Sequence, residues 1–321
     1  MKVSTRIRFG TGKQIQHNKK KRNSFTIKDF QLLILATPAI LVIFIFNYIP
    51  IGGVFIAFKN VNYRDGIFKS PWVGFENFKF FFTSNDAISV TRNTLLYNAA
   101  FIFFGTIIAV SFAVMLNEIT KRYVIKIFQT IFFLPYFFSW VIVSYMTYAL
   151  FSPLGTITNV LKNHGINISD FYANPSYWPV FLTLLYIWKY LGYYTIIFYS
   201  GIISISDKYY EAAAIDGASR LQTIRFITLP LLTPLIVIIT LLAIGRIFYS
   251  DFGLFYSVPM QNGQLYSVTQ VIDTYVFRIY RSSGDAGMAT AAGLYQSFIG
   301  FLLVLGSNYT IKKIYPEYGI F

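Results

Sequence analysis

The sequence predicts an all-α integral membrane protein with six transmembrane helices and both termini in the cytoplasm. The composition is too apolar for a water-soluble globule, six long apolar runs divide the chain, and basic residues are distributed unevenly between those runs. Of 321 residues, 55% are apolar and 12% are charged, whereas soluble domains carry about 25% charged residues. The chain has no cysteine and two histidines, which excludes a disulfide framework, a thiol nucleophile and a histidine-rich metal centre.

Each apolar run is long enough to cross a bilayer as a helix. About 20 apolar residues span the hydrocarbon core, and a helix satisfies the hydrogen bonds of its own backbone there. Pro50, Gly52 and Gly53 predict a break in the first run. The predicted spans are 30–58, 94–116, 127–151, 178–203, 231–249 and 286–309.

The basic residues predict the orientation of the spans. With the N-terminus inside, the inner segments hold 17 Lys and Arg and the outer segments hold 8, which is the bias of cytoplasmic loops. We therefore expect a multi-pass membrane protein. Residues 1–29 form a basic cytoplasmic segment suited to anionic lipid, and residues 30–321 form a six-helix transmembrane domain. The net charge of +14 is therefore attributed to membrane topology, and no nucleic-acid partner is expected.

The inner loop 206–230 predicts two short helices joined at a glycine. Asp207 places a negative charge at the start of the first helix. Gly217 permits the left-handed conformation that commonly ends a helix. A second helix over about 219–227 is expected to end before Pro230, because proline disrupts a helix interior. A compact helical pair of this kind is suited to binding a partner.

The same loop resembles the EAA loop of ABC-importer permease subunits. The matching residues are Glu211-Ala212-Ala213, Asp216-Gly217-Ala218 and Ile227-Thr228-Leu229-Pro230. The resemblance implies that the loop docks into a cleft of a separate ATPase subunit, with Glu211 facing a basic residue. The docking residues that it implies are Tyr210, Glu211, Ala212, Ala213, Asp216, Gly217, Ala218, Leu229 and Pro230.

Further segments resemble the maltose-type sugar permeases and their oligosaccharide (aldouronate-type) branch. Residues 72–78 and 273–278 carry the first likeness, and residues 251–256, 293–297 and the tail at Phe321 carry the second. The resemblance implies that residues 30–321 form a permease domain with the type I ABC-importer fold, in the bacterial cytoplasmic membrane. It also implies a carbohydrate cargo, most simply an oligosaccharide. It also implies a second EAA-type permease that forms the other half of the path, two copies of an ABC ATPase and an extracellular solute-binding lipoprotein.

No phosphate-binding loop of the Gly-x-x-x-x-Gly-Lys-Ser/Thr type occurs in the sequence. We therefore expect a non-catalytic subunit with no cofactor or metal of its own, while ATP and Mg²⁺ bind to the partner ATPase. The predicted spans contain no Asp, Glu or His, which disfavours a membrane-embedded enzyme. A secondary transporter would show repeated broken helices, and the sequence indicates a break only in the first span. An importer of another polar solute stays an alternative.

Aromatic and polar residues in the spans, and just beyond the outer end of the fifth span, are candidates for the substrate path. They are Tyr145, Lys189, Arg246, Tyr249 and Asp251. An intramembrane charge usually faces a cavity or a partner, so Lys189 either lines the path or, as we favour, bonds structurally to helix backbone. Arg246 can snorkel outward or pair with Asp251 or Asp273, and a structural role is favoured for it too. Asn98, in the second span, is ambiguous between packing and the path.

Overall fold

The computed structural model describes residues 27–83, 85–165 and 170–314. The basic segment up to residue 26 and the tail from residue 315, including Phe321, lie outside the described residues. The chain divides into two compact units, Met1–Gly53 and Val54–Phe321. In the described residues, six helices are long and apolar enough to cross a membrane, as the sequence predicts.

The first span is helical from Asp29 to Phe58. It consists of α1 (Ile27–Ile43), a π-helical turn (Phe44–Tyr48) and a 3₁₀ helix (Ile49–Phe58). The break expected around Pro50 is therefore a change of helix type, not an interruption. Pro50 follows the π-helical turn by two residues, and such turns accommodate irregularities in a helix.

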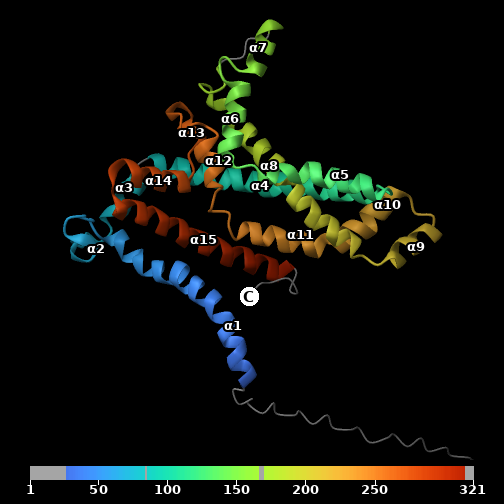
Figure 1. Ribbon diagram of the computed structural model, residues 1–321, viewed down its shortest axis with the longest axis horizontal. Helices are drawn as coiled ribbons and strands as arrows, with labels where there is room; N and C mark the ends of the chain where they lie inside the picture. Colours follow the sequence, from blue (N-terminus) through green and yellow to red (C-terminus); the bar gives the residue numbers. More distant parts are fainter. Residues whose placement is uncertain (1–26, 84, 166–169, 315–321) are drawn as a thin grey trace, which may run out of the picture. The chain divides into compact units, whose positions relative to one another are not determined.

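The second unit is built around α4 (Asn85–Asn117) and α8 (Trp178–Ile203), which pack along each other. α5 (Arg122–Phe133) packs on α8, while α11 (Leu229–Ile244) contacts α4, α8 and α15 (Ala286–Ile314). In Figure 1, α4, α5 and α11 extend along the same axis of the unit, with α5 antiparallel to α4. Buried alanines of α4 pack beside Phe198 of α8 and Leu232 of α11, because small residues let membrane helices approach closely.

The prediction of one continuous third span over residues 127–151 is wrong. α5 ends at Phe133 and is followed by a 3₁₀ turn that contains Pro135. Ser139 then caps a new helix, accepting a hydrogen bond of 3.3 Å from the Ile142 N–H. This helix, α6 (Trp140–Phe151), leads into α7 (Thr156–Asn163), and together they form the third long apolar helix. Figure 1 shows both projecting away from the α4–α8 pair.

The expectation that the second loop helix ends before Pro230 is also wrong. α10 (Arg220–Thr223) continues through a π-helical turn (Ile224–Thr228) into α11, giving one helix of 25 residues. Pro230 follows the π-helical turn by two residues, and such a turn accommodates the irregularity that a proline introduces inside a helix. The loop is therefore continuous with the fifth span, and that span ends at Ile244, five residues earlier than predicted.

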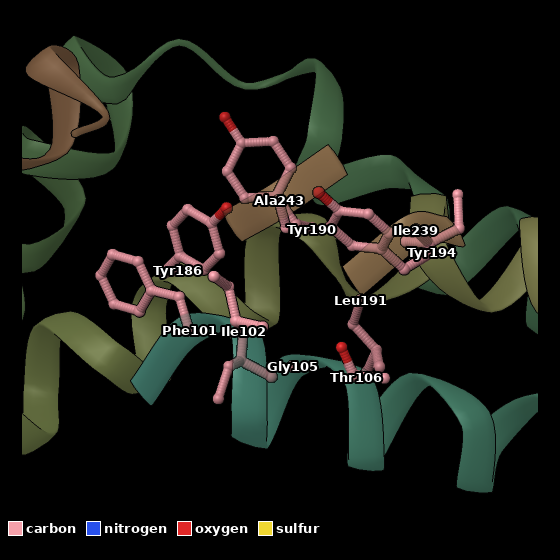
Figure 2. Close-up of a pocket in the computed structure, with 11 residues that line it drawn as sticks. Phe101, Ile102, Gly105, Thr106, Tyr186, Tyr190, Leu191, Tyr194, Ile239 and Ala243 are labelled. Carbon is pink, nitrogen blue, oxygen red and sulfur yellow. The ribbon is translucent and has the colours of Figure 1, made fainter. Parts of the chain in front are cut away.

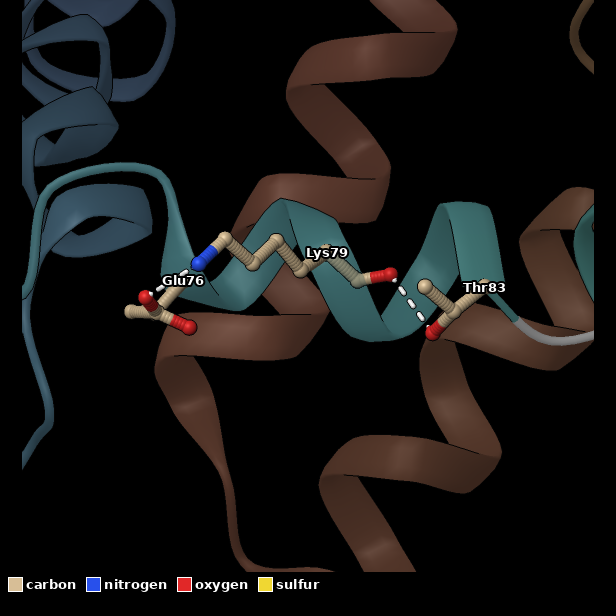
Figure 3. A network of polar contacts seen from close by, with 3 residues as sticks. All are labelled: Glu76, Lys79 and Thr83. Atoms are coloured by element: carbon tan, nitrogen blue, oxygen red, sulfur yellow. Dashed lines mark hydrogen bonds and ion pairs between the residues drawn. The ribbon is translucent and has the colours of Figure 1, made fainter.

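Short helices lie at the ends of the second unit. α9 (Asp207–Ile215) and α10 are at one end, while α3 (Glu76–Thr83) and α14 (Ile272–Ser283) are at the other (Figure 1). The remaining short helices are α2 (Gly66–Lys69), α12 (Phe252–Ser257) and α13 (Tyr266–Thr269). On α3, an exposed ion pair joins Lys79 Nζ to Glu76 at 2.6 Å (Figure 3); such surface pairs contribute about 0–1 kcal/mol.

Candidate functional site

A cavity of about 330 Å³ lies between α4, α8 and the turn that follows α11. Its aromatic wall consists mainly of Tyr186, Tyr190 and Tyr194, which are four residues apart and therefore share one face of α8. Figure 2 shows the three tyrosines beside one another, with Phe101 of α4 next to Tyr186. Phe101 stacks on Tyr186 with ring centroids 3.9 Å apart. The cavity thus offers a row of aromatic faces.

The polar wall of the cavity is the turn of residues 245–250. Three polar side chains, from α4, α15 and α14, bind the backbone of this turn. The bonds run from Asn98 Nδ2 to the Ile247 carbonyl (2.9 Å), from Gln296 Nε2 to the Phe248 carbonyl (2.6 Å), and from the Ser250 N–H to Asp273 Oδ2 (2.7 Å). Burial raises the pKa of Asp273, although its hydrogen-bond donors oppose the shift. Fixed from three sides, the turn presents its side chains in a defined position.

Asp251 ends the turn and joins three helices. Its Oδ2 accepts hydrogen bonds from Trp140 Nε1 at 2.7 Å and from the Tyr190 hydroxyl at 2.8 Å. Its Oδ1 accepts the Leu254 N–H at 3.4 Å and so caps α12. The carboxylate therefore positions Tyr190 in the aromatic wall and anchors the start of α6.

Lys189 lies beside the cavity at the break between α5 and α6. The side chain is buried, and its Nζ donates to the carbonyls of Tyr136, at 3.2 Å, and Phe138. The ammonium also lies 5.0 Å from the centre of the Trp140 ring. Lys189 thus satisfies carbonyl groups that the broken helix leaves free, which agrees with the structural interpretation favoured from the sequence.

The other predicted path residues divide between the cavity and the surface. Arg246, Tyr249 and Asp251 line the cavity together. Within the described ranges, no carboxylate forms an ion pair with Arg246, so the pairings with Asp251 and Asp273 considered from the sequence are absent. Tyr145 lies on α6, is 64% exposed and does not line the cavity.

Sequence reasoning missed several residues of the cavity. The tyrosines at 186, 190 and 194 carry a detectable signal, their spacing of four along a predicted helix. Asn98, which is ambiguous from the sequence, both lines the cavity and supports the turn. Gln296 and Asp273 act through contacts between distant segments, for which a single sequence gives no local signal.

The loop between the fourth and fifth spans has the predicted glycine joint. α9 ends in a turn where Gly217 has φ +73° and the Ala218 N–H donates to the Ala213 carbonyl at 2.9 Å, the bond of a Schellman-type end. Ser219 and Gln222 then form a capping box that starts α10. Both helices of the loop therefore have defined ends, and the angle between them is set at Gly217.

A hollow of about 490 Å³ lies between α9 and the helix that begins at Arg220. Of the predicted docking residues, those that line it are Ala212, Ala213, Asp216, Gly217 and Ala218. Tyr210, Glu211, Leu229 and Pro230 do not. The hydroxyl of Tyr210 lies 3.2 Å from Thr228 Oγ1 and so joins α9 to the π-helical turn. Leu229 and Pro230 start α11.

The surface around this hollow is unusually apolar for the tip of a loop. Ile215, Leu221 and Phe226 expose 87%, 79% and 67% of their surface. Glu211 is exposed nearby and forms no ion pair with any described residue. An apolar patch with a charged residue at its rim is typical of a protein interface.

These features define a class of protein: a helical membrane protein with a polar-aromatic cavity and a structured loop at one end. Residues 102–308 match the family of binding-protein-dependent transport system inner membrane components, and the chain belongs to this family. It is therefore a transporter permease subunit, a multi-pass protein of the inner membrane.

Relatives with curated names agree with this assignment over nearly the whole chain. Protein LplB of Bacillus subtilis (strain 168) is 34% identical over 92% of both chains. The polygalacturonan/rhamnogalacturonan transport system permease protein YteP of the same organism is 31% identical over 94% of this chain and 95% of its own.

A solved structure is similar in fold. It is a bacterial ABC transporter involved in the import of the acidic polysaccharide alginate, and it matches with a TM-score of 0.81 and 30% identity. The match covers 90% of this chain and 97% of the other. The chain therefore has the fold of an ABC importer permease.

Proposed function

We propose that this permease transports a carbohydrate, an oligosaccharide, and lines one half of the path. The observation that carries the proposal is the cavity in which the tyrosine row of α8 faces the polar turn after α11. Aromatic faces combined with a few fixed polar groups suit a sugar, whose ring has apolar faces and hydroxyl edges. The names of YteP and of the alginate transporter support the same cargo class.

The proposed complex contains this chain, a second EAA-type permease, two copies of an ABC ATPase and an extracellular solute-binding lipoprotein. The family description, which includes dependence on a binding protein, supports the last of these. Both termini and the loop 206–230 then lie in the cytoplasm, where ATP and Mg²⁺ bind to the ATPase. No cofactor or metal is proposed for this chain; among the described residues no His, Asp or Glu cluster suits a metal ion.

The uninterrupted helix from Arg220 to Ile244 suggests how a movement of the loop is transmitted to the cavity. One end of this helix carries the docking surface and the other runs into the turn 245–250. A push on the loop by the closing ATPase therefore moves the turn as part of a rigid body, in the manner of a switch between two access states. Coupling needs no further moving part between the two sites.

Transport by the reconstituted complex tests the proposed cargo. We expect proteoliposomes holding both permeases and the ATPase to accumulate a labelled oligosaccharide when given the binding protein and internal ATP. The purified chain alone should hydrolyse no ATP. Uptake of an amino acid or a polyol phosphate in place of any sugar would contradict the carbohydrate assignment. ATP hydrolysis by the chain alone would contradict the assignment of hydrolysis to a partner subunit.

Glu211→Lys is expected to weaken binding of the ATPase about tenfold or more, since it reverses a charge at the proposed interface. The measurement is the amount of ATPase that co-purifies with the tagged permease. Glu76→Lys, on α3 at the opposite end of the unit (Figure 3), is the matched control and should leave co-purification unchanged. Full retention of the ATPase by the Glu211 variant would contradict the docking role.

A further inference from the structure

The cavity wall contains one charged group that is satisfied and one that is not. Asp251 accepts hydrogen bonds from Trp140, Tyr190 and the Leu254 N–H, so its charge is spread over three donors. Arg246 lines the same cavity and forms no ion pair within the part of the chain that the structure describes. Because a guanidinium stays protonated in proteins, the cavity presents a positive charge that has no ion-pair partner, in addition to the hydrogen-bonded Asp251.

We infer that Arg246 is the residue by which this path selects sugars that carry a carboxylate. The inference rests on the proposed function and names the chemical group of the cargo that Arg246 binds. A carboxylate accepts two parallel hydrogen bonds from the arginine fork, an arrangement that a neutral sugar hydroxyl cannot match in charge.

The backbone that carries Arg246 is held in place in advance of binding. The residue that follows it, Ile247, is held through its carbonyl by Asn98, and the next, Phe248, by Gln296. A backbone that is already ordered loses little freedom when a ligand binds, which favours affinity. The guanidinium therefore projects from a rigid support, as a specificity-determining group requires.

The tyrosine row lies on the other side of the same cavity. Tyr186 and Tyr190 have ring centroids 4.6 Å apart, and the hydroxyl of Tyr190 is fixed by Asp251. Because these faces and Arg246 line one cavity, a sugar ring that lies against the tyrosines shares that space with the guanidinium. The alginate transporter, which shares this fold, imports an acidic polysaccharide, consistent with such a contact.

Two probes that differ only in charge test the inference in the reconstituted importer. They are an alginate trisaccharide and the same trisaccharide with its carboxyl groups reduced to alcohols. We expect Arg246→Gln to lower uptake of the acidic probe about tenfold or more and to leave uptake of the neutral probe nearly unchanged. Arg246→Lys keeps the charge but loses the fork, so its effect should be intermediate. Arg64→Gln, an exposed arginine outside the cavity, is the matched control.

Each other outcome separates this inference from the proposed function. If Arg246→Gln changes uptake of neither probe, or of both equally, Arg246 does not read the carboxylate, although the permease still carries sugar. Loss of the second permease on purification of the variant would place Arg246 in a subunit contact and overturn the inference, as would wild-type uptake of neutral oligosaccharides alone. Failure of the wild type to take up any sugar would instead overturn the proposed function.

Discussion

Replacing Gly217 with valine is expected to abolish uptake while leaving the protein in the membrane. Gly217 has φ +73°, and no atom lies within 4 Å of the position of an added Cβ. The effect therefore comes from backbone strain: a β-branched residue in this conformation costs roughly 1–2 kcal/mol or more. The chain relieves the strain by changing the angle between α9 and the helix that begins at Arg220, which displaces the docking surface.

Asparagine at the same position provides the control for this prediction. Asn adopts the left-handed conformation far more readily than valine, so Gly217→Asn should keep most of the uptake although it also adds a side chain. Uptake by whole cells and the amount of permease in the membrane fraction are measured for both variants. Uptake by the valine variant equal to that of the wild type would show that the angle at Gly217 does not matter for coupling.

The six spans and the glycine joint could be predicted because they depend on local properties. Apolar runs of sufficient length and a glycine between two helix-forming segments determine them without distant contacts. The two prolines show where local rules fail. At Pro135 the helix breaks, and the freed carbonyls are bound by Lys189, more than 50 residues away. At Pro230 a π-helical turn lets the helix continue. Tertiary contacts decide between these outcomes.

The candidate path was predictable only where its residues follow one another in sequence. Arg246, Tyr249 and Asp251 meet in the cavity because they share one turn at the end of a span. Tyr145 lies in the predicted third span, which is not one continuous helix: α6, which carries Tyr145, projects away from the α4–α8 pair. Asn98, Gln296 and Asp273 hold the turn in place from positions that are 23 to 149 residues away from their partners in the sequence. No pattern in a single sequence reveals such contacts.

Gly192→Ala is expected to destabilise the protein by about 3 kcal/mol or more, through overpacking. A Cβ at Gly192 would overlap the backbone of Phe132 and Phe133, where α8 crosses α5. Backbone atoms cannot rotate aside as a side chain can, so the two helices must separate. The measurement is the thermal unfolding midpoint of the purified permease in detergent. Gly293→Ala, in α15, is the control: nothing lies within 4 Å of its Cβ, so alanine should be neutral or stabilise the helix by up to about 1 kcal/mol.

The same close approach positions the residues beside the cavity, so the Gly192 variant has a second expected effect. Lys189 reaches the carbonyls of Tyr136 and Phe138 because α8 lies directly against the end of α5. Separating the helices removes these bonds. It also shifts Tyr190, the next residue of α8, whose hydroxyl donates a hydrogen bond to Asp251. Transport should therefore fall even in the fraction of molecules that stays folded. A variant that keeps both its unfolding midpoint and its uptake would show that α5 and α8 do not meet at Gly192.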